Sequence, residues 1–88
     1  MSYNIVYTKT AAKDILKLKS AHLDKTAKLL IEIIRENPWQ TPPPCEKLIG
    51  DLSGAFSRRI NVKHRLVYQV IEETHTVKII SLWSHYER

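Results

Sequence analysis

Several features that define particular protein classes are scarce or missing in this 88-residue chain. Its single cysteine, Cys45, excludes an intrachain disulfide framework and any metal site built from several cysteines. No apolar run approaches the roughly 20 residues that span a bilayer, and no signal-peptide pattern precedes the first strand-like segment. We therefore expect a cytoplasmic protein that does not use a membrane as a partner.

The short length and mixed composition favour one small globular domain. Hydrophobic residues make up 43% of the chain and charged residues 26%, which is too apolar a mixture for an intrinsically disordered protein. Domains contain about 50–250 residues, and the sequence has no repeat or low-complexity tail. We expect a single domain over residues 1–88.

Acidic residues are the minority among the charges. Nine Asp and Glu stand against 14 Lys and Arg, which leaves a formal net charge of +5. Residues 57–65 contain Arg58, Arg59, Lys63 and Arg65 and no acid. Such an excess of positive charge favours a polyanionic partner, so Arg58, Arg59 and Lys63 are candidates for RNA or phosphate binding. The alternative is an ordinary solvated strand face.

Hydrophobic periodicity predicts a strand followed by two helices. Residues 3–7 are rich in aromatic and β-branched side chains, as strands are. Thr8 or Thr10 can cap the first helix, Ser20 can cap the second, and Asn37-Pro38 ends the second. The apolar positions at helical spacing are Ala11, Ile15 and Leu18, then Leu23, Ala27, Leu30, Ile31 and Ile34. The short joint between the helices predicts an antiparallel hairpin.

The second half of the chain predicts a mainly antiparallel sheet. Three consecutive prolines make residues 39–44 a stiff extended connector. The expected strands cover residues 46–49, 55–61, 65–72 and 76–83. Together with the N-terminal strand and the helical hairpin they give an α+β fold with a four- to five-stranded sheet.

Strand alternation predicts where the positive charge lies. Ser57 and Arg59 share one face of their strand, opposite Arg58, and Arg65 shares a face with Val67. Each helix has one apolar stripe, so the hairpin should cover one face of the sheet only. The other face would then present Arg59 and Arg65 together, as a slot for phosphate.

The sequence also contains the groups that cleave RNA without a metal. Such cleavage needs a base for the 2′-hydroxyl, a proton for the leaving 5′-oxygen and fixed cations for the phosphorane. Glu46, Arg59, Arg65 and His85, with Tyr86 beside it, could supply them. Each also has a structural alternative: a solvated edge carboxylate, exposed strand charges, a frayed terminal histidine and a tyrosine lid on the core. The other histidines, expected at the surface, are His22, His64 and His75.

Five segments are distinctive when they occur together. They are Asn37-Pro38-Trp39-Gln40-Thr41-Pro42-Pro43-Pro44-Cys45-Glu46-Lys47-Leu48, Asp51-Leu52-Ser53-Gly54, Ser57-Arg58-Arg59-Ile60-Asn61, His64-Arg65-Leu66-Val67-Tyr68 and Trp83-Ser84-His85-Tyr86. With them the chain resembles, over essentially its whole length, the YoeB/Txe toxins of the RelE toxin–antitoxin superfamily. The resemblance implies a RelE-like, microbial-RNase-like fold. It also implies a ribosome-dependent mRNA endonuclease that inhibits translation and uses the RNA 2′-hydroxyl as nucleophile, without metal or cofactor.

The resemblance implies a role for each matching residue. Glu46 corresponds to the general base, Arg65 to the arginine that stabilises the transition state, and His85 to the general acid. Arg59 corresponds to a supporting phosphate contact and Tyr86 to a residue that positions the substrate.

The resemblance implies partners as well: a YefM/Axe-like antitoxin, the ribosome and its mRNA, and assembly as a homodimer or a toxin–antitoxin hetero-oligomer. An acidic antitoxin segment could cover Arg59 and Arg65 and fold on binding. Two alternatives remain: a non-catalytic, ParE-like gyrase inhibitor on the same scaffold, and a nucleic-acid-binding module without turnover. The gyrase inhibitor would not need Glu46, Arg65 and His85 to converge, and the binding module would bind bulk RNA or DNA with a steep salt dependence.

Overall fold

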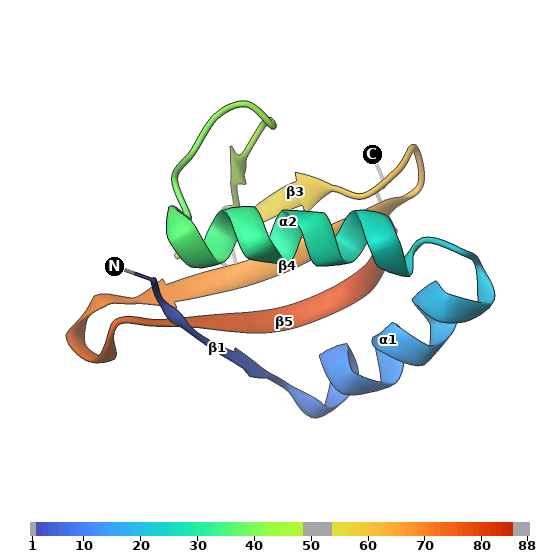
Figure 1. The fold of residues 1–88 in the computed structure, drawn as a ribbon, viewed down its shortest axis with the longest axis horizontal. Coiled ribbons are helices and arrows are strands. Elements are labelled where there is room, and N and C mark those ends of the chain that lie inside the picture. The colour runs from blue at the N-terminus through green and yellow to red at the C-terminus, as the bar shows by residue number, and fades with distance from the viewer. Residues whose placement is uncertain (1, 49–53, 86–88) are drawn as a thin grey trace.

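A computed structural model of the chain describes residues 2–48 and 54–85, with side chains as far as residue 83. The elements, in order, are β1 (Asn4–Tyr7), α1 (Lys9–Ser20), α2 (Asp24–Glu36), β2 (Glu46–Lys47), β3 (Ala55–Arg59), β4 (His64–Ile71), the 3₁₀ turn η2 (Glu72–Thr74) and β5 (Thr76–His85) (Figure 1). The predicted α+β fold, with its N-terminal strand, helical hairpin and mainly antiparallel sheet, is confirmed.

The five strands form one sheet in the order β1-β5-β4-β3-β2. β1 runs parallel to β5, with Asn4 opposite Thr76, and the other neighbouring pairs are antiparallel. The last strand of the chain therefore lies between the first strand and β4. The predicted short edge strand is present as β2, and the last predicted strand extends two residues further, to His85.

The ends of the helices agree only partly with the sequence prediction. Thr8 caps α1 as expected, because its Oγ1 accepts a hydrogen bond of 3.0 Å from Ala11 N. The prediction that Ser20 caps the second helix is wrong, since α1 continues through Ser20. Backbone groups make the turn instead: His22 adopts a left-handed conformation with φ 61°, and Leu23 N donates to Leu18 O at 2.8 Å.

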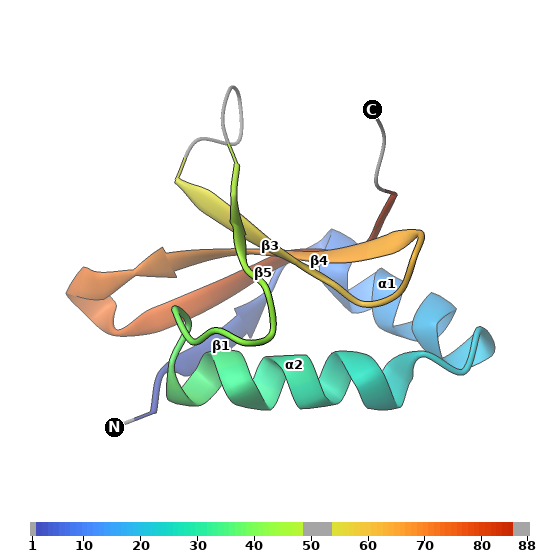
Figure 2. The ribbon, with the colours of Figure 1, turned by 90° about the horizontal axis from the view of Figure 1, so that it is seen from above.

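The helices and the sheet share one hydrophobic core. Figure 2 shows α2 lying along one face of the sheet, and α1 packs mainly against β5. The buried core residues are Ala11, Leu18, Ala27, Leu30, Ile31, Ile34, Ile60, Leu66, Tyr68, Val77, Ile79 and Leu82. In the described part of the chain no helix covers the opposite face (Figure 2), as the single apolar stripe of each helix predicts. Neither helix has the length and apolarity that crossing a bilayer requires.

The connector between α2 and β2 is fastened to the sheet by Arg58. It loops out from the end of α2 and returns to β2 (Figure 1). Arg58 is 1% exposed; its Nη1 donates to Pro43 O at 2.7 Å and its Nη2 to Pro38 O at 3.0 Å. The prediction that Arg58 binds phosphate is wrong, because alternation turns its side chain to the helix-covered face, where the connector carbonyls occupy it.

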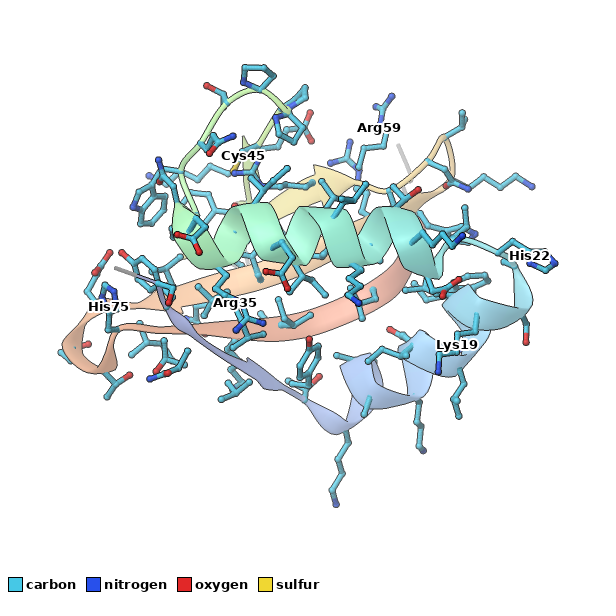
Figure 3. All side chains as sticks on the ribbon, in the orientation of Figure 1. Lys19, His22, Arg35, Cys45, Arg59 and His75 are labelled. Carbon is cyan, nitrogen blue, oxygen red and sulfur yellow. The ribbon has the colours of Figure 1, made fainter. Side chains whose placement is uncertain are left out.

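Tyr68 completes this anchor. Its hydroxyl donates to Pro38 O at 2.7 Å and accepts from Arg58 Nε at 3.2 Å. The Sγ of Cys45 lies 3.1 Å from the same hydroxyl, where the connector meets the sheet (Figure 3). The residue that follows Cys45 is Glu46, so the anchor also fixes the start of β2.

The Tyr68 anchor predicts a pH-dependent stability. Burial, and then the hydrogen bond with Cys45, raises the pKa of the Tyr68 hydroxyl above its usual value near 10. A group whose pKa is raised by folding stabilises the fold below its unfolded pKa, and this contribution is lost as the pH rises above it. We expect Tyr68→Phe to lower the free energy of unfolding by about 1–3 kcal/mol at pH 7 and by clearly less above pH ~10.

Urea unfolding of both proteins at neutral and alkaline pH measures this difference. Tyr7→Phe is the matched control, because Tyr7 is 43% exposed and should give a small difference at either pH. A Tyr68→Phe difference that grows with pH would contradict the assignment.

Candidate active site

Three neighbouring strands bring three of the predicted site residues, Glu46, Arg59 and Arg65, to one face of the sheet. Glu46 on β2 lies opposite Ser57 on β3, and Arg59 on β3 lies opposite Arg65 on β4. Ser57 and Arg59 are two residues apart and therefore point to the same side. That side is the sheet face opposite the helical layer. Segments separated by up to 19 residues along the chain thus meet in two adjacent cross-strand rows.

Arg65 is held tightly at the centre of this arrangement. The residue is 7% exposed, and its Nη1 lies 2.5 Å from Glu46 Oε1 and 2.7 Å from Ser57 Oγ. The Glu46 side chain is 57% exposed, against 8% for that of Arg65. Charge-assisted hydrogen bonds of this kind are short and strong. The guanidinium group is consequently fixed in position, while the carboxylate remains accessible from solvent.

A cleft of about 250 Å³ opens at these residues, and Pro44, Glu46, Ser57, Arg59 and Arg65 line it. Arg59 is exposed, and its side chain extends outward from the end of β3 (Figure 3). Arg59 and Arg65 give the cleft a positive lining. The planar guanidinium group of an arginine can donate paired hydrogen bonds to phosphate oxygens.

The donors in the cleft suit an anion better than a metal. A guanidinium group has no lone pair for a cation, so one carboxylate and one hydroxyl are the remaining oxygen ligands. Among residues 2–48 and 54–83, no three His, Cys, Asp or Glu side chains gather as a metal ion requires.

The C-terminal end of β5 runs alongside this cleft. Ser84 lies opposite Arg65, and His85 lies opposite His64. The backbone of the predicted general acid is therefore in the row next to the central arginine. The side chain of His85 and the whole of Tyr86 lie outside the described residues.

The turn between β3 and β4 carries Lys63 at the rim of this region. Asn61 Oδ1 accepts hydrogen bonds from Lys63 N at 2.9 Å and from His64 N at 2.7 Å, which fixes the turn. Lys63 itself is exposed. The prediction that His64 lies at the surface is wrong: it is 8% exposed, and its ring stacks on Trp83 at 3.9 Å between centroids. His22 and His75 are exposed, as predicted.

Sequence reasoning missed Ser57 as a site residue. Its hydroxyl accepts from Arg65, and the residue is only 1% exposed. The available signal was its position two residues before Arg59, which places both on the same face. Nothing else in the sequence distinguishes Ser57 from a strand serine whose hydroxyl is exposed to solvent.

Known proteins of similar sequence identify the family of this chain. A family model described as the YoeB-like toxin of bacterial type II toxin-antitoxin systems matches residues 7–86. The chain belongs to this family. It is 37% identical to Toxin YoeB of Synechocystis over 86 residues, which cover 96% of this chain and 98% of that protein. The protein is therefore a toxin of a type II toxin–antitoxin system.

Solved structures place this YoeB-family toxin among close structural relatives. The YoeB/ParE toxin from Agrobacterium tumefaciens superposes with a TM-score of 0.85 at 28% identity, over 94% of this chain and 99% of that one. YoeB of Staphylococcus aureus is 32% identical over 98% of this chain and 100% of its own, with TM-scores of 0.82 as a dimer and 0.79 in a YoeB-YefM complex. The toxin thus has the fold of the relatives that its sequence resembles.

Proposed function

We propose that this YoeB-family toxin is a ribosome-dependent mRNA endonuclease that cleaves RNA without a metal or cofactor. The observation that carries the proposal is the Arg65 guanidinium, which Glu46 and Ser57 hold in a cleft that Arg59 also lines. A fixed cation beside an accessible carboxylate matches the needs of a phosphorane formed by attack of a neighbouring hydroxyl.

In this mechanism Glu46 is the general base. Arg65 engages its Oε1, so Oε2 accepts the proton of the 2′-hydroxyl. The 2′-oxygen then attacks phosphorus, and Arg65 stabilises the negative charge that gathers on the non-bridging oxygens. His85 gives its proton to the departing 5′-oxygen, which leaves a 2′,3′-cyclic phosphate and a free 5′-hydroxyl. Tyr86 positions the substrate.

Positive charge at the cleft and around it serves docking. Arg59 and Lys63 are exposed near the catalytic row, and the whole chain carries a net charge of +5. Ribosomal RNA and the single-stranded message in the decoding site, within the cytoplasm, offer the phosphates that such a surface binds. A YefM-like antitoxin with an acidic segment would mask the same charges, and the Staphylococcus aureus complex of YoeB with YefM supports this partner.

Incubation with programmed ribosomes and a defined mRNA, followed by primer extension, tests the function. We expect the wild-type protein to cut the message and Glu46→Gln to cut it about 10²-fold more slowly, because the amide cannot accept the proton. Glu36→Gln is the matched control, since it removes one exposed helical carboxylate and should leave the rate unchanged.

An intact message in the presence of wild-type protein would reject the nuclease. If DNA replication stalls in cells that express the toxin while their mRNA stays intact, the gyrase-inhibitor alternative is correct. Binding to bulk RNA without any cleavage would indicate a nucleic-acid-binding module.

A further inference from the structure

The mechanism above leaves one buried acidic group unused. Asp14 lies on α1 and is only 4% exposed. Its Oδ2 accepts hydrogen bonds from two consecutive backbone amides of β5, Leu82 N at 3.0 Å and Trp83 N at 3.2 Å. A buried carboxylate is costly unless it is hydrogen-bonded, so this contact fixes where the strand lies relative to the helix.

The strand needs this contact because its pairing with β4 is irregular at this point. Val67 lies opposite Ser81 and Arg65 lies opposite Ser84, so two steps along β4 match three along β5. Leu82 lies within this bulge. An extra residue in one strand disrupts the ladder locally and bends the strand, which leaves backbone groups to be satisfied elsewhere.

The other edge of β5 changes partner at the same place. β1 ends at Tyr7, opposite Ile79. Beyond that point Thr8 takes over: its hydroxyl donates to Ile80 O at 2.7 Å, and its N donates to Ile79 O at 3.1 Å. Asp14, in the second turn of α1, accepts hydrogen bonds from the next amides of β5, those of Leu82 and Trp83. The cap and the second turn of α1 thus replace a neighbouring strand along the bulged segment.

The residues that follow Trp83 on β5 include His85, the proposed general acid. Trp83 is held at its amide by Asp14 and at its ring by the stack on His64, with an interplanar angle of 21°. The next two residues, Ser84 and His85, pair with Arg65 and His64. The direction in which the chain leaves Trp83 therefore sets the backbone position of His85 relative to Arg65.

We propose that Asp14 is a positioning residue for the acid step: by clamping the β5 bulge at Leu82 and Trp83, it fixes the backbone of Ser84 opposite Arg65 and that of His85 opposite His64, the position from which His85 protonates the leaving 5′-oxygen. The inference rests on the proposed nuclease function. Asp14 touches neither the substrate nor the reacting atoms, and it acts only through the backbone of β5.

The test compares two RNA substrates on programmed ribosomes, one normal and one with sulfur in place of the scissile 5′-oxygen. A thiolate leaves without a proton, so the second substrate bypasses the general acid. We expect Asp14→Ala to lower kcat about 10²-fold on the oxygen substrate, with KM unchanged, and to cleave the sulfur substrate within about 3-fold of wild type. Asp14→Asn keeps one acceptor oxygen and should lose about 10-fold on the oxygen substrate.

The matched control is again Glu36→Gln, which makes the same change of charge on the other helix. Loss of rate by the same factor on both substrates would overturn the proposal, because it would indicate general damage to the fold. A wild-type rate on the oxygen substrate would overturn it too. If Asp14→Ala does not fold, Asp14→Asn decides the question with the same pair of substrates.

A second measurement separates this inference from the nuclease itself. Amide hydrogen exchange in the full chain should speed up by at least 10-fold at Leu82 and Trp83 in Asp14→Ala, and the amide resonances of Ser84 and His85 should shift. Absence of cleavage by wild-type protein would reject the nuclease alone. Unchanged exchange and resonances would reject the positioning role, whatever the enzyme activity.

Discussion

Replacing Arg65 by alanine should lower the rate of mRNA cleavage by about 10³-fold while the protein remains folded. The guanidinium group is the fixed cation of the cleft, held by Glu46 and Ser57 before any substrate binds. A cation that needs no reorganisation stabilises developing charge far better than a mobile one. The fold should tolerate the loss, because Glu46 is half exposed and water can solvate its carboxylate.

Single-turnover cleavage on programmed ribosomes measures this effect, with urea unfolding to show that the fold is intact. Lys78→Ala is the matched control. Lys78 is an exposed residue of β5 and lies opposite Gln69 of β4. Gln69 points to the same sheet face as Arg65 but is four residues further along β4, so the loss of Lys78 removes one charge without touching the cleft. Arg65→Lys should recover little activity, because an ammonium group lacks the planar donor fork. Cleavage by Arg65→Ala within 10-fold of the control would refute the assigned role.

Replacing Arg58 by alanine should destabilise the fold more than Tyr68→Phe does, lowering the free energy of unfolding by about 3–5 kcal/mol. The side chain is 1% exposed and donates to Pro38 O, Pro43 O and the Tyr68 hydroxyl. Its removal leaves a cavity, and it takes one donor from the buried carbonyl of Pro38 and one from the partly buried carbonyl of Pro43. In a domain of this size each 1 kcal/mol corresponds to about 4–8 °C in Tm, so a fall on the order of 15–30 °C is expected.

Thermal unfolding of Arg58→Ala and Arg59→Ala makes the comparison direct, because the two residues are adjacent and identical in type. Arg59 is exposed, and its substitution should change stability by less than about 0.5 kcal/mol. Arg58→Met, which fills much of the same volume, should stay destabilised, since a thioether cannot bond the carbonyls. Equal Tm values for the Arg58 and Arg59 variants would show that the connector is not held as described.

Periodicity was sufficient to predict the frame on which the candidate site is built. Alternation along two strands placed Arg59 and Arg65 on one face, and the observed register puts them directly opposite each other. The single apolar stripe of each helix correctly predicted that one face would be covered. Local chemistry also narrowed the cap of α1 to Thr8 or Thr10, of which Thr8 is the cap, and identified Asn37-Pro38 as the end of α2.

The wrong helix cap at Ser20 is a local error, because α1 continues through that residue. The other errors and omissions depend on contacts between distant segments. Arg58 looks like a phosphate ligand until the connector carbonyls that occupy it are known. Asp14 stands among lysines on an amphipathic helix, which is the usual setting of a solvated charge, and its partners are 68 and 69 residues away. The extra residues of β5 opposite β4 are invisible to a two-residue period, and they give Asp14 its role.

The place of β5 in the sheet has a consequence for how the newly synthesised toxin folds. The first strand, β1, pairs with residues 76–79, so it can gain its neighbour only after those residues have been synthesised. The sheet cannot form completely before residues 76–85 are available, because β5 lies inside it, between β1 and β4. Pairing of β1 with β5 is therefore a contact between distant segments, which closes late in folding and lowers the folding rate.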